Sequence, residues 1–105
     1  MTLNEYQQLS RGTAVYKDGL KTIDGLTYSI LALCGETGEL ANKLKKYHRS
    51  GTKPDVHVLA DEAGDCLWYL ASVAQELGMT LEDIAQMNID KLAKRKAENV
   101  VTDHK

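Results

Sequence analysis

The chain has 105 residues, a length that suits one domain spanning residues 1–105. Its formal net charge of -2 gives no reason to expect nucleic acid or an anionic membrane as its main partner. No apolar run approaches the roughly 20 residues of a membrane span, and the N-terminus lacks the basic start and apolar stretch of a signal peptide. We therefore expect a cytoplasmic globular domain.

The first half of the chain predicts two helices. Thr2 and Glu5 have the spacing of a capping box, which predicts a helix over residues 3–16. The segment KDGLKTIDG is typical of a loop, and its Asp24 is a candidate N-cap for the helix that follows. That second helix is predicted over residues 25–48, and the segment RSGTKPD after it is typical of a turn.

The second half predicts two more helices, over residues 55–77 and 81–98. No stretch shows the two-residue alternation of a strand, so the predicted fold class is all-α. The second and third helices each have about 23 residues, or roughly 35 Å, which is long for this chain. Because two shorter helices cover only part of their apolar faces, we expect a four-helix bundle completed by oligomerisation.

Two acidic pairs lie at the edges of the apolar stripes of the long helices. At 100° per residue, Glu36 and Glu39 fall about 60° apart on the second helix. Glu62 and Asp65 have the same relation on the third helix. Four carboxylates that converge between neighbouring helices cannot all stay ionised without a cation. Oxygen ligands of this kind suit Mg²⁺, with Mn²⁺ as a substitute.

A single acidic pair of this spacing is more often a solvated helix face than a site. Here the same register recurs in separate helices, and Gly35, Gly38 and Gly64 stand beside the acids. Each glycine costs about 1 kcal/mol relative to alanine in a helix interior. Glycine leaves the backbone open to a ligand or a neighbouring helix, although chance packing of small residues is the alternative. The recurrence favours a metal site.

The predicted fourth helix repeats the pattern with Asn88, Lys91 and Arg95. Lys91 and Arg95 are placed to hold anions that the metal bridges, which indicates a metal–polyphosphate site; a surface stripe is the alternative reading. On the third helix Tyr69 lies at the acid edge, suited to stack on a base or bond a phosphate, with ordinary packing as the alternative. Trp68 falls further from the stripe, which suits a subunit contact or ordinary packing.

Three segments, ALCGETGELANKLKK, LADEAGDCLWYLASVAQELG and NIDKLAKRK, resemble the MazG-like nucleotide pyrophosphohydrolases. That family is built on Glu-x-x-Glu, a spacer and Glu-x-x-Asp, and the spacer here is residues 40–61. The similarity extends over residues 3–96. One departure is Lys96-Ala97, where many members have Tyr-Pro, so the C-terminal lid of the family is not expected here in the same form.

The resemblance implies an all-α bundle that forms homodimers or homotetramers. It implies Mg²⁺-dependent hydrolysis of nucleoside triphosphates between the α- and β-phosphates, giving a monophosphate and pyrophosphate. Nucleotide-pool cleaning is the expected role, and the alternatives are removal of damaged nucleotides, adjustment of nucleotide pools and a duty within a mobile element. The metal ligands it implies are Glu36, Glu39, Glu62 and Asp65, with Glu36 or Glu39 as the general base. The residues it places near the substrate are Lys43, Asn88, Lys91 and Arg95. A salt bridge from Lys43 to Glu39 is the alternative for that lysine.

Two other functions fit parts of the sequence. A di-iron oxidoreductase also uses glutamates on bundle helices, but it needs Glu-x-x-His pairs, which the sequence lacks. A non-catalytic helical module for nucleotide binding or assembly is the remaining alternative. Cys34 and Cys66 both sit among apolar residues, so we expect two buried free thiols.

Overall fold

The computed structural model describes residues 1–14 and 23–98. Within those ranges it contains four helices and no strand, which confirms the all-α class. The helices are α1 (Leu3–Arg11), α2 (Ile23–Ser50), α3 (Val56–Glu76) and α4 (Leu81–Ala97). The predicted helices over residues 25–48, 55–77 and 81–98 match α2, α3 and α4 to within two residues.

The first helix is shorter than predicted. It begins at Leu3, where the predicted Thr2–Glu5 capping box forms its first turn, and it ends at Arg11. From Gly12 the chain winds more tightly than an α-helix. The backbone N–H groups of residues 12–14 bond carbonyls three residues earlier, and not four. Residues 15 and 16 of the predicted helix lie outside the described residues.

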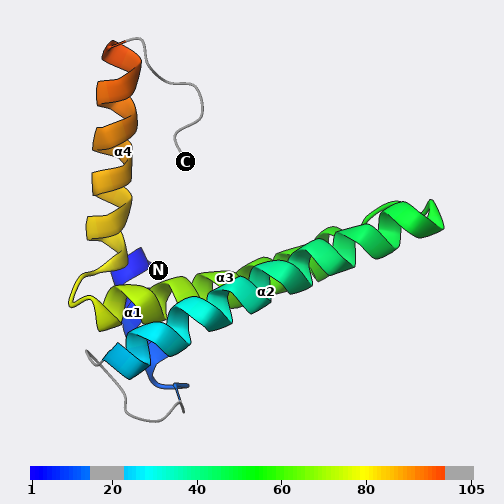
Figure 1. Cartoon of the computed structure of the whole chain (residues 1–105), viewed down its shortest axis with the longest axis horizontal. Helices are drawn as coiled ribbons and strands as arrows, with labels where there is room; N and C mark the ends of the chain where they lie inside the picture. The colour runs from blue at the N-terminus through cyan, green and yellow to red at the C-terminus, as the bar shows by residue number, and fades with distance from the viewer. Residues whose placement is uncertain (15–22, 99–105) are drawn as a thin grey trace.

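The two long helices form an antiparallel hairpin, the arm, with α1 and α4 at the end opposite its turn (Figure 1). The turn follows Gly51, whose φ of 73° is in the left-handed region that favours glycine. Asp55 caps α3 by accepting the backbone N–H groups of His57 and Val58 at 2.9 and 3.4 Å. The arm therefore places α2 and α3 side by side along its whole length.

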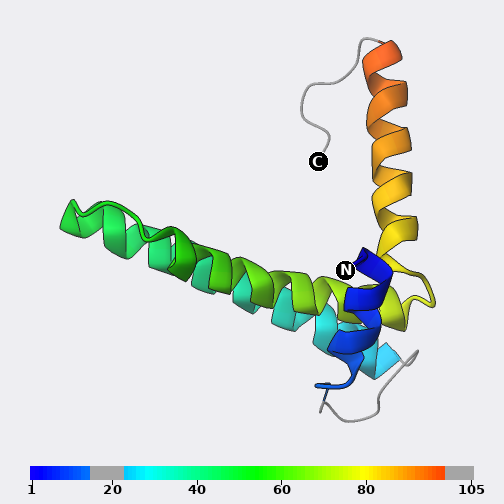
Figure 2. The ribbon, with the colours of Figure 1, turned by 180° about the vertical axis from the view of Figure 1, so that it is seen from behind.

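The fourth helix leaves the arm and projects away from it (Figures 1 and 2). It begins after a capping box formed by Thr80 and Asp83, as predicted. Among the described helices α4 contacts α1 and α3 but not α2. The four described helices therefore form an open arrangement, in which no other described helix packs against most of α4.

The core is small and lies where α1, α3 and α4 meet. Its buried apolar side chains are Ala71, Ala74 and Leu81, with Tyr6 and Ile84 packed against them. The accessible surface is 7600 Å², whereas a compact monomer of 11.6 kDa exposes about 5,800 Å². The radius of gyration is 16.2 Å, against roughly 13 Å for a compact chain of this length. One chain therefore leaves much apolar surface uncovered.

A single buried glutamine joins the three elements of the core. Gln7 donates its amide hydrogens to the Gln75 side chain at 2.9 Å and to the Met79 carbonyl at 3.0 Å. Its oxygen accepts the backbone N–H of Leu81, the first residue of α4, at 2.6 Å. Gln7 thus fixes the start of α4 against α1 and α3.

Replacing Gln7 with leucine is expected to lower the free energy of unfolding by about 3 kcal/mol, because one buried and two half-buried partners lose their hydrogen bonds. Urea denaturation followed by circular dichroism measures the change. The matched control is Gln8→Leu, since Gln8 is exposed and its replacement is expected to change stability by less than about 0.5 kcal/mol. Equal effects of the two substitutions would show that Gln7 does not hold the junction.

Candidate metal centre

Three acids from the two helices of the arm converge. Glu36 of α2 and Glu62 and Asp65 of α3 each offer a carboxylate oxygen, and these oxygens lie within 4.8 Å of one another. The helical period explains why these acids come together. Glu36 and Glu62 are half-buried and lie on the faces of α2 and α3 that pack against each other. Three of the four predicted acids are therefore brought together in one chain.

Burial, together with the neighbouring acids, raises the pKa of Glu36 above its ordinary value. Burial is the largest cause, followed by the charges of Asp65, Glu62 and Glu39 and a hydrogen bond with Asp65. A divalent cation would offset the same repulsion. Three ligands at about 2.1 Å from one Mg²⁺ lie up to about 4.2 Å apart, so small side-chain rotations fit the cluster to that ion. The donor set, which is all oxygen, suits Mg²⁺ or Mn²⁺.

The fourth predicted ligand, Glu39, lies outside the three-acid cluster. Its side chain is exposed, because a 60° turn around α2 from Glu36 leads away from α3. Its charge still reaches Glu36 and contributes to the raised pKa of that residue. Glu39 as a metal ligand remains a prediction.

Lys43 lies next to the cluster and pairs across the arm. Its Nζ is 3.8 Å from a carboxylate oxygen of Glu62, so the ion pair in the structure is with Glu62 rather than with Glu39. The lysine side chain is 36% exposed, and an ion pair of this kind contributes less than about 1 kcal/mol to stability. Its position at the acids is consistent with the predicted contact to substrate phosphates.

A pocket of about 380 Å³ opens beside the acids and has both acidic and aromatic lining. Its lining residues are Glu36, Asp65, Trp68, Tyr69 and Thr13. A hydrogen bond with Tyr28, burial and nearby acidic charges raise the pKa of Tyr69 to about 12, so its hydroxyl stays protonated at neutral pH. Tyr69 therefore lies where the sequence predicted it.

The pocket also contains residues that sequence analysis missed. Trp68, considered above as a subunit contact, lines the pocket and donates its indole N–H to Thr13 at 2.8 Å. The Arg11 guanidinium lies 4.8 Å from the centre of the Trp68 ring. No sequence signal linked Thr13 or Arg11 to the acids, because more than 50 residues separate them from Trp68.

The remaining predicted binding residues lie elsewhere. Asn88, Lys91 and Arg95 are on α4, which projects away from the arm and has no contact with α2 in the described chain (Figure 1). Asn88 and Lys91 are exposed, and Arg95 is half-buried. Within one chain the structure does not bring them to the acids, so their role in substrate binding remains a prediction.

The two cysteines are free thiols, as predicted, but they are not both buried. Cys34 is exposed and Cys66 is half-buried. Cys34 is wrong as a buried thiol because it lies about 160° around α2 from Glu36, away from the face that meets α3. Burial first, and then the charges of Glu36, Asp65 and Glu62, raise the pKa of Cys66, which makes it a poor nucleophile.

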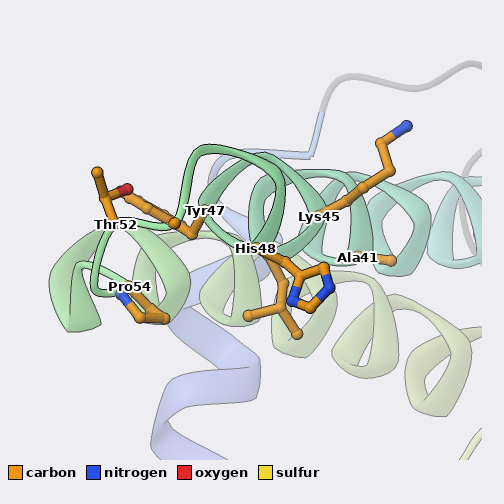
Figure 3. Close-up of a pocket in the computed structure, with 8 residues that line it drawn as sticks. Ala41, Lys45, Tyr47, His48, Thr52 and Pro54 are labelled. Carbon is orange, nitrogen blue, oxygen red and sulfur yellow. The ribbon is translucent and has the colours of Figure 1, made fainter.

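A larger hollow of about 610 Å³ lies at the tip of the arm (Figure 3). Its lining is mostly apolar and includes Ala41, Leu44, Tyr47 and Pro54, with Lys45 and His48 as its basic residues. It has no acidic side chain that could hold a hard cation. The chemistry predicted from the sequence therefore belongs to the smaller pocket beside Glu36.

Residues 26–100 match the sequence model of the MazG nucleotide pyrophosphohydrolase domain. The chain belongs to the MazG family. The matched range includes all four predicted acids of this MazG domain and helices α3 and α4, whereas α1 lies outside it. This confirms the resemblance found in the sequence.

A curated protein is similar to this MazG chain over nearly its whole length. Gene 37 protein of Mycobacterium phage L5 is 36% identical over 107 residues, covering 96% of this chain and 94% of the phage protein. No solved structure matches the chain. Among the described residues no helix is long and apolar enough to span a membrane.

Proposed function

We propose that this MazG domain is a Mg²⁺-dependent pyrophosphohydrolase that cleaves nucleoside triphosphates between the α- and β-phosphates. The observation that carries the proposal is the convergence of Glu36, Glu62 and Asp65 beside a pocket with an aromatic wall. The acids suit a metal bound to phosphates, and the wall suits a nucleoside. We infer that the duty is the cleaning of nucleotide pools, as the family resemblance implies.

The residues in and beside the pocket have different proposed roles. Glu36, Glu62 and Asp65 would hold Mg²⁺, with Glu39 as a fourth ligand at the edge. The ion, when bound, lowers the pKa of a coordinated water and offsets phosphate charge. Of the two candidate bases, Glu36 is favoured because it belongs to the acid cluster and lines the pocket, whereas Glu39 lies outside both. Lys43, beside Glu62, is placed to bind phosphate oxygens.

Two observations support assembly into a homodimer or homotetramer. The apolar stripe of the arm is only partly covered, since Ile30 is 44% exposed and Leu70 is 43% exposed. In addition, a Cβ atom built on Gly35, Gly38 or Gly64 would meet nothing within 4 Å in this chain. A second copy packed on these surfaces would cover the apolar side chains. It would also place a neighbouring helix against the open backbone at the helical glycines.

A glutamate at position 70 tests the assembly. We expect Leu70→Glu to convert the oligomer to monomers, because a charge would then have to be buried in the interface without a partner. Sedimentation velocity measures the mass. Thr27→Glu, which places the same charge at an exposed polar position of α2, is expected to leave the mass unchanged. A wild-type chain that sediments as a monomer at all concentrations would exclude the assembly.

The activity is tested with a panel of ribo- and deoxyribonucleoside triphosphates in Mg²⁺, with pyrophosphate and orthophosphate measured separately. We expect pyrophosphate as the product. In water labelled with ¹⁸O the label is expected in the monophosphate, which shows attack at the α-phosphorus. Orthophosphate would mean that another bond is cut. Nucleotide binding without any product would favour the non-catalytic module.

A further inference from the structure

Arg11, the last residue of α1, and Thr13 in the turn that follows hold the single tryptophan of the chain in place through three contacts. Thr13 Oγ1 accepts the indole N–H at 2.8 Å. The Arg11 guanidinium lies 4.8 Å from the ring centre, and its Nη2 donates to the Trp68 carbonyl at 3.4 Å. A segment outside the range that matches the MazG domain is therefore attached to a wall of the candidate pocket.

The hydroxyl of Thr13 has one orientation available for this contact. It donates its own hydrogen to the Ser10 carbonyl at 2.8 Å, so its lone pairs are left for the indole N–H, which can only donate. Ser10 is fixed in turn, because its hydroxyl donates to the Gln7 carbonyl at 2.7 Å and accepts from Arg11. The acceptor that meets Trp68 is thus set by the last turn of α1 and the turn that follows it.

The contact extends from Trp68 to the acids. The Trp68 and Tyr69 rings lie edge to face, with centres 4.9 Å apart and planes at 78°. Tyr69 then meets Tyr28 of α2 at 6.3 Å between ring centres. Glu36 and Asp65 line the same pocket. A triphosphate held by its phosphates at the acids would therefore place its nucleoside end near this aromatic wall.

We propose that Thr13 is a positioning residue: with Arg11 it holds Trp68, and through Trp68 the Tyr69 ring, as the surface on which the nucleoside end of the substrate lies. This rests on the proposed function. The surface contacts the part of the substrate that does not react, so it binds the ground state and the transition state equally. Loosening it raises KM and leaves kcat nearly unchanged.

The test compares Thr13→Val with Thr13→Ser. Valine keeps the shape but removes the hydroxyl, so the emission of Trp68 in the nucleotide-free protein is expected to shift to the red as the indole becomes more mobile and hydrated. KM is expected to rise about 3- to 10-fold, the worth of one hydrogen bond, with kcat within about twofold. Serine keeps both hydrogen bonds and is expected to restore emission and KM.

Two further variants complete the experiment. Arg11→Met removes the charge over the ring and is expected to change emission and KM in the same direction as Thr13→Val. Thr52→Val is the matched control, because Thr52 lies at the tip of the arm and bonds Ser50 there. It is expected to behave as wild type. Circular dichroism confirms that each variant keeps its helices.

The outcomes separate this proposal from the proposed function. Unchanged emission and KM in Thr13→Val overturn the positioning role. A fall in kcat that serine does not restore also overturns it, since this indicates a general structural defect. If the wild type releases no pyrophosphate from any nucleotide, the proposed function fails and the role in substrate binding fails with it. The emission shift of Thr13→Val then still shows that the turn after α1 holds the indole.

Discussion

Pyrophosphate release is expected to fall by about 10²- to 10³-fold when Glu36 is replaced by glutamine. The substitution removes a carboxylate from the three-acid cluster and also removes the favoured general base. Helical content is expected to survive, because glutamine has the same shape and relieves repulsion from Glu62 and Asp65. Initial rates at saturating Mg²⁺ and far-ultraviolet circular dichroism measure the two effects.

The matched control for this substitution is Glu39→Gln on the same helix. Glu39 is exposed and lies outside the cluster, so we expect a higher Mg²⁺ requirement and a smaller loss of rate than for Glu36→Gln. Wild-type turnover by Glu36→Gln would remove Glu36 from the mechanism. A larger loss in Glu39→Gln than in Glu36→Gln would exchange the roles of the two glutamates.

Removing divalent cations is expected to abolish turnover and to lower the melting temperature. An ion that binds the folded state at one hundred times its Kd stabilises it by about 2.7 kcal/mol. For a chain of this size that corresponds to an increase in Tm of about 10 °C or more. Thermal unfolding with chelator, and then with Mg²⁺ or Mn²⁺ added back, measures the increment. Pyrophosphate assays on the same samples measure recovery.

The cluster itself should be the origin of the thermal effect. In Glu36→Gln the increment in Tm from Mg²⁺ is expected to shrink to a small fraction of the wild-type value, because one of three ligands no longer carries charge. Ca²⁺ serves as the comparison, since it is larger and prefers more ligands. An equal increment in the variant and the wild type would place the bound ion somewhere else on the chain.

Much of the fold followed from local features of the sequence. Capping residues at Thr2 and Thr80 marked two helix starts, and the segment around Gly51 marked the turn of the arm. The meeting of Glu36 with Glu62 and Asp65 followed from the helical period, because the faces of two antiparallel helices are set by register. These features depend on residues near one another in the chain.

The rest depended on contacts that local patterns do not encode. The start of α4 is fixed by Gln7, whose partners lie more than 65 residues further along the chain. The difference between Glu36 and Glu39 depends on how closely α3 approaches one side of α2. The hydrogen bond between Thr13 and Trp68 joins a turn to a distant helix, and no periodic pattern in the sequence indicates that contact.

The connectivity of the arm has a consequence for how the protein folds. Since α2 and α3 are consecutive and joined by a short turn, their contacts near the turn close small loops, and helical topologies of this kind fold in microseconds to milliseconds. Meeting a second copy is a bimolecular event and becomes slower on dilution. Refolding should therefore show a fast rise in helicity that is independent of protein concentration. A slower recovery of activity should follow, with a rate that increases with protein concentration.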